Sequence, residues 1–588
     1  MLFEKNQLLE LTVIGITGEG NGVARYTDAD VPSSKFVVFI PYTAVGDRVL
    51  CRIVKVQKCH AFGRVERVLS PSMDRVEQRD CAVFGRCGGC AWRHVTYEAE
   101  CRYKSTWVGD TLRRIGGVDT PLLPLVACDE PDRYRNKAQF PVQATNDGPV
   151  MGFFAPRSHR IVACRDCLLQ PLGFQAALDA VNDWMRRYDV PAYDENNHMG
   201  LVRHVYIRQG GVSGQMMVCL VCTSGKVPCT SALIDLLRAA VPSLTSLVVN
   251  INPHKTNVIL GEKGFTLWGE DAIEDTLCGL HFRLSPHSFY QVNHAQTERL
   301  YALVADAANL TGKETLLDLY CGTGTIGLSM AHRAKQIIGV EVVEAAVEDA
   351  RRNASANGIE NARFICADAA DAAVQLSREG VIPDVVVLDP PRKGCDESLV
   401  ETVVGMAPAR VVYVSCDPAT LARDLARFGE KGYRVNTVQP VDMFPRTAHC
   451  ETVVCLSRQI NVHKMKLNST PFEMIKSGEK NIELRLYDEK RQRIKVGDKI
   501  VFTNNTTGET LHSTVVKLHR FDNFDELYKT LPLLKCGYTT DNIDTATPAD
   551  MEQYYSVEEQ KKYGVVGIEI CRPKEITDET VACLLPKN

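Results

Sequence analysis

The chain has 588 residues and a mass of 65.2 kDa, which is too long for one hydrophobic core, and at about 150 residues per domain it predicts roughly four structural units. The net charge of −4 gives no general nucleic-acid signature, so any RNA-binding lysines and arginines must be gathered locally. No apolar run approaches the roughly 18 residues that cross a bilayer, and the N-terminus lacks the pattern of an export signal. We therefore expect a cytoplasmic protein without a membrane partner, whose 22 cysteines serve metal binding or catalysis rather than a disulfide framework.

Residues 1–68 alternate apolar and polar side chains over short stretches that are broken by turn glycines. This pattern predicts a small β-barrel. Near its last strands the segment carries four basic residues, Lys55, Lys58, Arg64 and Arg67. They face either an RNA backbone or solvent at a strand edge, and the composition favours neither alternative.

Residues 69–285 begin with the cysteine-rich stretch CAVFGRCGGCAWRHV and continue with a helical pattern from about Tyr97 to Ile115. Strand-like segments such as RNKAQFPVQ and GQMMVCLVCT follow, together with a helix near residues 173–188. We predict a mixed α+β central domain. Its helical part, at about residues 93–120, is expected to pack on the domain that follows in the chain.

Between residues 286 and 460 the pattern changes to helices that alternate with continuous apolar strands, namely TLLDLYC, QIIGVEV, VVVLDPP and RVVYVSC. Such strands are typical of a parallel sheet that is covered by helices on both faces. This segment is therefore predicted to be a Rossmann-like α/β domain. Residues 462–588 are richer in lysine and predict a separate β-barrel domain.

The first of those apolar strands runs into a glycine-rich turn, LLDLYCGTGTIGL, at residues 316–328. Gly322 and Gly324 let the backbone turn tightly and approach a ligand. The next strand ends in Glu341, which is placed to accept hydrogen bonds from ribose hydroxyls. The turn lacks the full glycine fingerprint of a dinucleotide site, so the pattern favours S-adenosylmethionine over the alternative, a nicotinamide cofactor.

Two further strand ends complete a site at the carboxyl edge of the sheet, where ligands bind in such folds. VVVLDPPRKG supplies Asp389 and Arg392, and VVYVSCDPATLARDL places Cys416 where a strand meets a helix. Free N–H groups at a helix start lower the pKa of a thiol, and the thiolate is the nucleophile. An isolated cysteine is more commonly a small buried apolar residue, but this position in a methyltransferase-like domain favours nucleophilic catalysis.

Three motifs carry a family resemblance: Ser415–Pro418, Leu388–Arg392 and Thr447–Thr452. In residues, spacing and order they resemble the signature motifs of the bacterial RNA uridine-5-methyltransferases, and the resemblance extends over roughly residues 1–458. It implies that Cys416 attacks carbon 6 of uracil so that carbon 5 accepts a methyl group. It also implies that Glu451 is the general base that removes the carbon 5 proton. Carbon 5 is a weak nucleophile, and a covalent adduct is the usual solution to that difficulty.

The cofactor-binding residues implied by this resemblance and by the glycine turn are Gln291, Tyr320, Gly322, Glu341 and Asp389. Arg392 stands where amine-directed methyltransferases often carry an aromatic residue, which argues against methylation of an exocyclic amine. Cys450 departs from the family pattern, because relatives usually carry an aliphatic residue before the glutamate. We expect this cysteine to be a tolerated small apolar substitution.

The cysteine-rich stretch places three thiols with the spacing C-x5-C-x2-C, and two more follow in VACRDCLLQ. Thiolates at this density bind zinc or an iron–sulfur cluster. The spacing resembles the [4Fe-4S] site of the same family, which implies the ligands Cys81, Cys87, Cys90 and Cys167. Cys164 is the alternative fourth ligand, and zinc or free buried thiols are alternatives to the cluster. For a cluster we expect a structural or RNA-shaping role.

Both ends of the chain resemble small modules. Residues 1–68 resemble the TRAM domain, an oligonucleotide-binding barrel attached to RNA-modifying enzymes. The last segment resembles an ASCH domain, a β-barrel related to the PUA fold, through Pro471–Glu473, Gly478–Lys480, Glu483–Arg485 and Val496–Asp498. This second resemblance favours extra RNA contact through Lys480 and Arg485, and the alternative is a fused domain with an unrelated substrate.

These observations predict a monomeric enzyme that methylates carbon 5 of uridine in 23S ribosomal RNA. The cluster and the N-terminal barrel favour ribosomal RNA, because the transfer RNA members of the family generally lack both, and the same reaction on transfer RNA is the nearest alternative. A non-catalytic RNA-binding or ribosome-assembly factor would need neither Cys416 nor Glu451. A radical S-adenosylmethionine enzyme is disfavoured because such enzymes usually use the spacing C-x3-C-x2-C.

Overall fold

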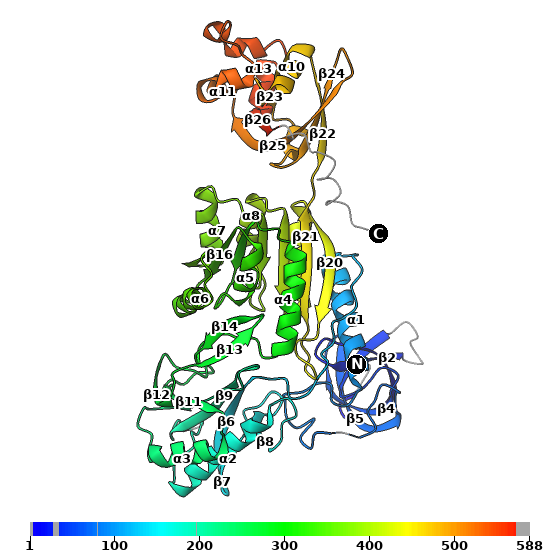
Figure 1. Cartoon of the computed structure of the whole chain (residues 1–588). Coiled ribbons are helices and arrows are strands. Elements are labelled where there is room, and N and C mark those ends of the chain that lie inside the picture. The colour runs from blue at the N-terminus through cyan, green and yellow to red at the C-terminus, as the bar shows by residue number, and fades with distance from the viewer. Residues whose placement is uncertain (1–3, 28–34, 79, 196, 572–588) are drawn as a thin grey trace. The chain divides into compact units, whose positions relative to one another are not determined.

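The computed structural model describes residues 4–27, 35–78, 80–195 and 197–571. The chain divides into two compact units, and the division lies between Ser457 and Arg458 (Figure 1). Among the described residues, no helix is long and apolar enough to cross a membrane. Each unit is described by itself.

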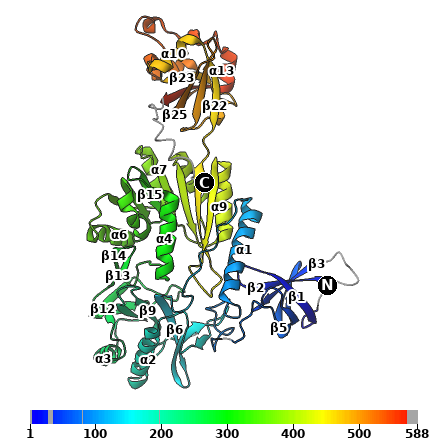
Figure 2. The same cartoon turned by 45° about the vertical axis from the view of Figure 1, so that its right-hand side comes forward.

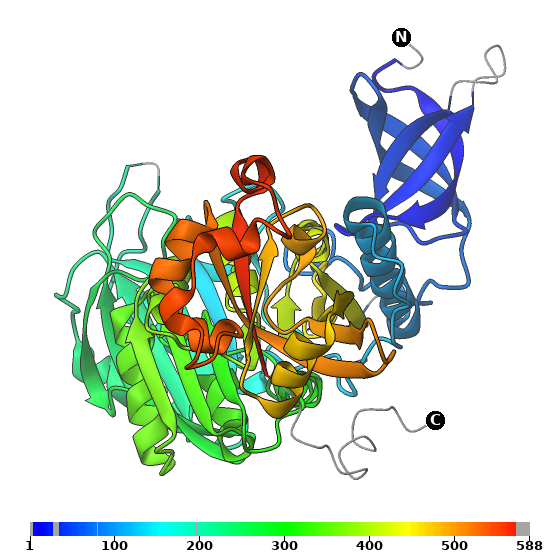
Figure 3. The ribbon, with the colours of Figure 1, turned by 90° about the horizontal axis from the view of Figure 1, so that it is seen from above.

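The first unit begins with a closed five-stranded barrel, whose neighbouring strands run in the order β1-β2-β3-β5-β4 (Figure 3). Its strands are β1 (Leu8–Ile16), β2 (Asn21–Thr27), β3 (Lys35–Pro41), β4 (Arg48–Val56) and β5 (His60–Ser70). Alternate side chains of β1 point inward, so that Leu9, Leu11 and Val13 are buried. The alternation of apolar and polar residues in the sequence therefore corresponds to one buried and one exposed face of the strand.

Helix α1 (Tyr97–Gly116) follows the cysteine-rich segment. Its first turn is capped by Thr96, whose side chain accepts the N–H of Ala99. The helix packs along α9 (Pro418–Glu430), as Figure 2 shows. The contact is close enough that a Cβ at Gly116 would lie 2.6 Å from the carbonyl oxygen of Ala422, so this position requires glycine.

The central part of the first unit is a seven-stranded mixed sheet in the order β12-β11-β10-β9-β6-β7-β8. Its strands are β6 (Lys137–Thr145), β7 (Gly148–Phe154), β8 (Ile161–Ala163), β9 (Val202–Gln209), β10 (Met216–Cys222), β11 (Leu244–Ile251) and β12 (Lys263–Gly269). Helices α2 (Leu172–Arg187) and α3 (Thr230–Ala240) share one core with these strands. A hairpin of β13 (Ile273–Leu277) and β14 (Leu280–Leu284) leads into the next sheet.

The second large sheet has seven strands in the order β17-β16-β15-β18-β19-β21-β20. Its strands are β15 (Thr315–Leu319), β16 (Gln336–Glu341), β17 (Ala362–Cys366), β18 (Val385–Leu388), β19 (Arg410–Ser415), β20 (Tyr433–Val441) and β21 (Glu451–Arg458). The strands from β17 to β19 are parallel, whereas β21 pairs with β19 in the antiparallel sense. The strand order reverses between β15 and β18, which is the place where such folds bind ligands.

Helices cover both faces of this sheet. One face carries α4 (His294–Ala308), α5 (Thr325–Ser329) and α6 (Glu344–Ala356), and the other carries α1, α7 (Ala369–Arg378), α8 (Glu397–Gly405) and α9. Neighbouring strand residues alternate between the two cores, so that Val387 faces the first set of helices and Leu388 the second. The continuous apolar strands of the sequence follow from this burial on two sides.

The second unit is a five-stranded sheet in the order β22-β24-β25-β26-β23, curved into a half-barrel. Its strands are β22 (Val462–Leu467), β23 (Ile482–Leu486), β24 (Lys499–Asn504), β25 (Thr510–Phe521) and β26 (Val565–Cys571). Its helices are α10 (Ser469–Ser477), α11 (Phe524–Thr530), α12 (Leu533–Cys536) and α13 (Val557–Tyr563).

The predicted fold class is confirmed: a Rossmann-like sheet with an N-terminal barrel, a mixed central region and a C-terminal half-barrel. The limits predicted for four domains, near residues 68, 285 and 460, stay predictions. The contacts divide the chain into two units rather than four.

Candidate active site

Four of the predicted site residues lie at the carboxyl ends of neighbouring strands. Tyr320 follows β15, Glu341 ends β16, Asp389 follows β18 and Cys416 follows β19. Because these strands are parallel, their carboxyl ends meet at the same edge of the sheet. The registers pair Leu319 with Leu388 across β15 and β18, which brings the residues that follow these two positions next to each other.

The glycine turn after β15 has the backbone that its sequence predicts. Gly322 and Gly324 have φ angles of 55° and 82°, in the left-handed region, and Gly324 caps the start of α5. The carboxylate of Glu341 accepts the N–H of Gly322 at 3.1 Å and the N–H of Val343 at 3.0 Å. Glu341 therefore fixes the turn, and each carboxylate oxygen keeps a lone pair for another donor.

Two further contacts hold this turn from below. Asp318 is buried in β15 and accepts the N–H of Gly327 at 3.0 Å, and burial raises its pKa to about 7. The hydroxyls of Tyr301 and Thr325 are 2.7 Å apart and join α4 to the start of α5. The turn is thus preorganised by side chains that lie beneath it.

Gln291 lies just before α4, and its backbone carbonyl accepts the side-chain amide of Asn136 at 2.8 Å. Within the described residues, no hydrogen bond joins the Gln291 side chain to Tyr320, Gly322 or Glu341. The structure therefore brings four of the five predicted cofactor residues to one sheet edge, and the cofactor role of Gln291 stays a prediction.

Cys416 and Glu451 face each other across the pair of strands β19 and β21. The antiparallel register pairs Ser415 with Thr452, so the next pair beyond the ladder is Cys416 with Glu451. Only 4 % of Glu451 is exposed, whereas Cys416 is half-buried. A thiol and a carboxyl group from two sequence-distant motifs thus share one side of the sheet edge.

Burial controls the charge state of the two carboxyl groups. It raises the pKa of Glu451 to about 8, with a further increase from the nearby Asp389 and an opposing effect of Arg392. The pKa of Asp389 rises to about 7 for the same reason. Carboxyl groups with a pKa near neutrality can accept and return protons at physiological pH.

The expected low pKa of Cys416 is wrong for the protein without substrate. Burial raises the pKa of this thiol to about 11, with smaller increases from Glu451 and Asp389 and a decrease from Arg392. The start of α9 offers little compensation, because the Asp417 carboxylate already accepts the N–H groups of Ala419 and Thr420 at 2.8 and 3.2 Å. The helix N–H groups expected to stabilise a thiolate are therefore occupied.

Arg392 is the cation that lowers the pKa of both Cys416 and Glu451. Its guanidinium lies 3.1 Å from Nε2 of His449, and its carbonyl accepts the hydroxyl of Thr420 at 3.1 Å. Burial, with Arg392 next in effect, lowers the pKa of His449 to about 4. The imidazole is therefore neutral and can accept a hydrogen bond from the arginine without adding charge.

The five predicted metal-site cysteines line one cavity of about 260 Å³, namely Cys81, Cys87, Cys90, Cys164 and Cys167. Three basic side chains, Arg93, Arg135 and Lys137, line the same cavity. A hydrogen bond from Cys164 lowers the pKa of Cys167 to about 6. Among the described residues, no three His, Cys, Asp or Glu side chains form a group that could hold a metal ion, so the geometry does not choose between Cys164 and Cys167.

Comparison with known proteins supports this interpretation of the site. Residues 268–459 match the sequence profile of the tRNA (Uracil-5-)-methyltransferase family. An uncharacterised RNA methyltransferase of Halalkalibacterium halodurans is 44% identical over 453 residues, which cover 77% of this chain and 97% of that protein. An uncharacterised RNA methyltransferase of Listeria monocytogenes is 42% identical, with 77% and 98% of the two chains covered. The chain belongs to the RNA (uracil-5-)-methyltransferase family.

A solved structure agrees with this family. The tRNA (uracil-54, C5)-methyltransferase of Pyrococcus abyssi, in complex with S-adenosyl-L-homocysteine, has a TM-score of 0.60 and 25% identity. The match covers 76% of this chain and 100% of that one. Family, fold and neighbour together support an S-adenosylmethionine-dependent enzyme that acts on uracil in RNA.

The flanking modules are also identified by their sequences. Residues 3–65 match the TRAM domain and residues 465–574 match the ASCH domain. The four basic residues predicted on the barrel, Lys55, Lys58, Arg64 and Arg67, are all exposed. Arg64 is paired with Glu66 at 2.7 Å, and this pairing reduces the charge that it offers to an RNA backbone.

The expectation that Lys480 and Arg485 contact RNA is wrong, because both side chains turn into the second unit. Lys480 is 8% exposed and pairs with the buried Glu483 at 2.9 Å. Arg485 pairs with the same carboxylate at 2.7 Å and also donates to the hydroxyl of Tyr555. The motif spacing placed these residues correctly on β23 and before it, but it carried no signal of burial.

No pattern in the sequence indicates the buried ion network that lies next to the active site. Lys104 of α1 pairs with Glu100 at 2.7 Å and with Asp442 at 2.8 Å, and all three side chains are buried. In the sequence, Glu100 and Lys104 have the i, i+4 spacing of an ordinary exposed helix pair. Their burial against a loop 338 residues further along the chain was not visible in that spacing.

The raised pKa of Cys416 predicts slow alkylation of the free protein. Between pH 7 and pH 9 the rate for the Cys416 peptide should rise about tenfold per pH unit without a plateau, because only the thiolate reacts. Iodoacetamide labelling with peptide mass spectrometry measures the rate. The urea-unfolded protein is the control, and its Cys416 peptide should level off near the ordinary thiol pKa of about 8.5. A plateau below pH 7 in the folded protein would contradict the prediction.

Proposed function

We propose that this protein methylates carbon 5 of a uridine in 23S ribosomal RNA through a covalent adduct between Cys416 and carbon 6 of the base. The observation that carries the proposal is the facing pair of Cys416 and Glu451 at the end of β19 and the start of β21. A nucleophile for carbon 6 and a base for the carbon 5 proton, next to each other at one sheet edge, suit this chemistry. The target base must leave its stack to reach a half-buried thiol.

The reaction begins at Cys416. Its thiol loses a proton to solvent, and the sulfur then bonds to carbon 6 of uracil, which makes carbon 5 electron-rich. Arg392 assists this step, because its charge lowers the pKa of Cys416 and opposes the increase that burial causes. Since the thiol is protonated in the free protein, we expect ionisation to accompany the binding of RNA.

Glu451 completes the reaction. After carbon 5 has received the methyl group, its proton must leave so that the bond between carbon 6 and sulfur can break. Within the described residues, the Glu451 carboxylate has no hydrogen-bond or ion-pair partner, so it is free to take this proton. With a pKa of about 8, Glu451 is largely protonated at neutral pH and must ionise before it takes the carbon 5 proton, which it then binds firmly and returns to solvent.

S-adenosylmethionine, when bound, supplies the methyl group. Tyr320, Gly322, Glu341 and Asp389 would hold it at the carboxyl edge of the sheet, with Gln291 as the fifth predicted contact. The fit rests on the free lone pairs of the Glu341 carboxylate, which suit ribose hydroxyls, and on the left-handed backbone at Gly322. These residues would position the methyl donor beside Cys416.

Ribosomal RNA is the proposed substrate because the chain combines a TRAM barrel with a cysteine-lined cavity next to the catalytic domain. Transfer RNA is the second candidate. It is favoured by the Pyrococcus abyssi neighbour, which is named for a transfer RNA uracil and whose match covers 76% of this chain, well beyond the catalytic domain. The parts of the chain outside the catalytic domain therefore do not exclude transfer RNA by their fold.

We further propose that Cys81, Cys87, Cys90 and Cys167 bind a [4Fe-4S] cluster, with Cys164 as the alternative fourth ligand. The support is the chemistry of the donors, since five thiols line one cavity of about 260 Å³, although they are not gathered closely enough in this structure to hold a metal ion. Arg135 and Lys137 line the same cavity and would balance part of the negative charge of a thiolate-bound cluster, whereas Arg93 is already paired with Asp80 and Asp132. The cluster would shape the segment before α1 rather than take part in methyl transfer.

Incubation with labelled S-adenosylmethionine and unmodified ribosomal or transfer RNA tests the reaction, with nucleoside mass spectrometry as the measurement. We expect 5-methyluridine in ribosomal RNA and none with Cys416→Ala, because no adduct can form without the thiol. 5-Methyluridine in transfer RNA alone would support the proposed reaction and contradict the proposal that ribosomal RNA is the substrate. No methylated uridine in either RNA, with the cofactor bound, would favour an RNA-binding or ribosome-assembly factor.

Glu451→Gln tests the base. The amide keeps the size of the side chain but cannot take the carbon 5 proton, so methyl transfer should proceed while release of the thiol stalls. An SDS-stable protein–RNA adduct that carries labelled methyl groups should therefore accumulate, as seen by denaturing gel. The double variant Cys416→Ala, Glu451→Gln is the matched control and should give no adduct. Normal turnover by Glu451→Gln would show that another group removes the proton.

Cys87→Ser tests the cluster. Anaerobically purified wild-type protein should absorb visible light and contain iron, and the variant should lose both because a hydroxyl is a poor ligand for iron–sulfur clusters. Cys229→Ser is the matched control, since Cys229 is exposed and lies outside the cavity. Equal absorbance in wild type and Cys87→Ser would refute the assignment, and zinc without iron would favour the alternative metal.

A further inference from the structure

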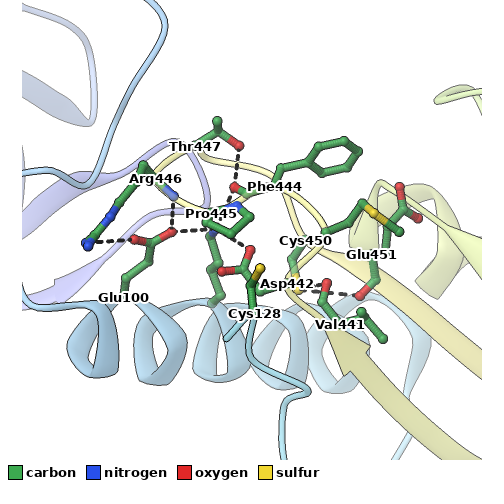
Figure 4. Close-up of polar contacts among 12 residues, drawn as sticks. Glu100, Cys128, Val441, Asp442, Phe444, Pro445, Arg446, Thr447, Cys450 and Glu451 are labelled. Carbon is green, nitrogen blue, oxygen red and sulfur yellow. Dashed lines mark hydrogen bonds and ion pairs between the residues drawn. The ribbon is translucent and has the colours of Figure 1, made fainter. Parts of the chain in front are cut away.

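The loop that precedes Glu451 is residues 442–450, between β20 and β21, and we call it the base loop (Figure 4). Glu451 is the first residue after it, and its carboxylate has no partner among the described side chains that would hold it directly. The position of this carboxylate is therefore set by the backbone at the start of β21, which the β19–β21 pairing holds on one side and the base loop on the other. What fixes the loop therefore helps to fix Glu451.

Lys104 of α1 fixes the first half of the base loop. Its ammonium group contacts the carboxylate of Asp442 at 2.8 Å and donates to the carbonyl of Phe444 at 3.1 Å. The hydroxyl of Tyr97, about two turns earlier on the same face of α1, donates to the second oxygen of Asp442 at 2.8 Å. Both oxygens of a buried carboxylate are thus held by one helix.

Glu100, also on α1, fixes the middle of the base loop. Its carboxylate accepts the backbone N–H of Arg446 at 2.7 Å and lies 3.6 Å from the guanidinium of the same residue (Figure 4). It also accepts a hydrogen bond from the ammonium group of Lys104 at 2.7 Å, so the two halves of the loop are joined through one pair of side chains. Arg446 has a φ of 67°, a left-handed backbone that a non-glycine residue adopts only when its surroundings hold it.

The last part of the base loop returns to its own beginning. The thiol of Cys450 is fully buried and donates to the carbonyl of Val441, 3.5 Å away. The thiol thus closes the loop at its base, directly before Glu451. The departure from the aliphatic residue of the family adds this contact.

We infer that Glu100, Lys104 and Asp442 form a brace that positions Glu451 for removal of the carbon 5 proton. The inference rests on the proposed function, in which Glu451 is the base. These three side chains touch neither substrate nor cofactor, so they are positioning residues. A loosened brace displaces the carboxylate from the adduct and slows the release step, while attack by Cys416 and methyl transfer keep their geometry.

The brace acts through position rather than through its electric field. Together with Arg446 it contains two carboxylates and two cations, which balance each other. The charged groups that shift the pKa of Glu451 are Asp389 and Arg392, and both lie outside the brace. Weakening the brace should therefore leave the pH midpoint of the release step unchanged, whereas a change of field would move it.

The test is a single-turnover experiment on the full chain with labelled S-adenosylmethionine and the RNA that the wild type methylates. Glu100→Gln keeps the shape of the side chain but removes the charge that holds Arg446 and Lys104. We expect methyl transfer into the SDS-stable adduct at close to the wild-type rate. Release of methylated RNA should slow roughly 10- to 100-fold, the cost of a small misplacement of a catalytic group. The pH midpoint of release should stay that of the wild type.

Two further variants serve as a control and as a milder test. Asp110→Asn, on the exposed face of the same helix, breaks an ion pair with Arg114 at 3.1 Å and should release RNA normally. Tyr97→Phe removes one hydroxyl from Asp442 and provides a milder variant if Glu100→Gln unfolds, which a thermal melt reveals. With Tyr97→Phe the same selective delay is expected, at smaller size.

Several outcomes would overturn the inference. Equal release rates in Glu100→Gln, Tyr97→Phe and wild type would mean that the brace does not position Glu451. A parallel fall of methyl transfer and release would indicate a general structural role, and a shifted pH midpoint would indicate an effect of charge. Failure of the proposed function looks different, because wild-type protein would then form no adduct that depends on Cys416.

Discussion

Strand β21 runs antiparallel beside β19 in a sheet that is otherwise parallel up to that point, and this pairing brings Glu451 opposite Cys416. In a purely parallel sheet, only residues that follow strands would meet at the ligand-binding edge. The reversal adds a residue that precedes a strand. The register that pairs Ser415 with Thr452 cannot shift by one residue, because such a shift would turn the Glu451 side chain toward the opposite face of the sheet. The chemistry proposed for the site depends on this register.

The cost of the arrangement is the burial of several carboxyl groups without a matching cation at each. Asp318, Asp389 and Glu451 all have a pKa that burial raises to about 7 or 8. An acid whose pKa is raised in the folded state destabilises that state when it ionises, so stability falls as pH increases toward the raised value. Such groups persist only where the surrounding packing holds them, and they are typical of sites that move protons. Arg392 offsets part of the unfavourable burial of negative charge, but it forms no ion pair with Glu451 that would neutralise the base.

The fold and the main site residues were predictable because their signals are local. Continuous apolar strands, the glycines at residues 322 and 324 and the motif around Cys416 each reflect one element and its ends. What failed depended on contacts between distant segments. The pKa of Cys416 was misjudged because burial among the surrounding segments raises it, and the helix N–H groups do not offset this increase since Asp417 already uses them. The burial of Lys480 depended on a strand and a helix of its own unit, and basic residues carry no mark that distinguishes an exposed cation from a paired one.

The parts of the chain outside the catalytic sheet converge on the loop before Glu451. The N–H groups of Ala91 and Trp92, directly after Cys90, donate to the carbonyl of Arg446 at 2.8 and 3.2 Å. The hydroxyl of Tyr134, from the segment after α1, donates to the carbonyl of Pro445 at 3.0 Å. A cavity of about 240 Å³ joins the β1–β2 turn of the barrel, the cysteine segment and residues 447–449.

These contacts give a physical reason for cysteines that lie far from the methyl chemistry in sequence. A constraint on Cys90 also constrains the two N–H groups that follow it, and these groups donate to the carbonyl of Arg446. Glu100 accepts the N–H of the same residue. The cysteine segment and α1 therefore act on one loop from two directions. A cluster in the cavity would act on the base loop without electron transfer, through the position of the Ala91 and Trp92 N–H groups that bind Arg446.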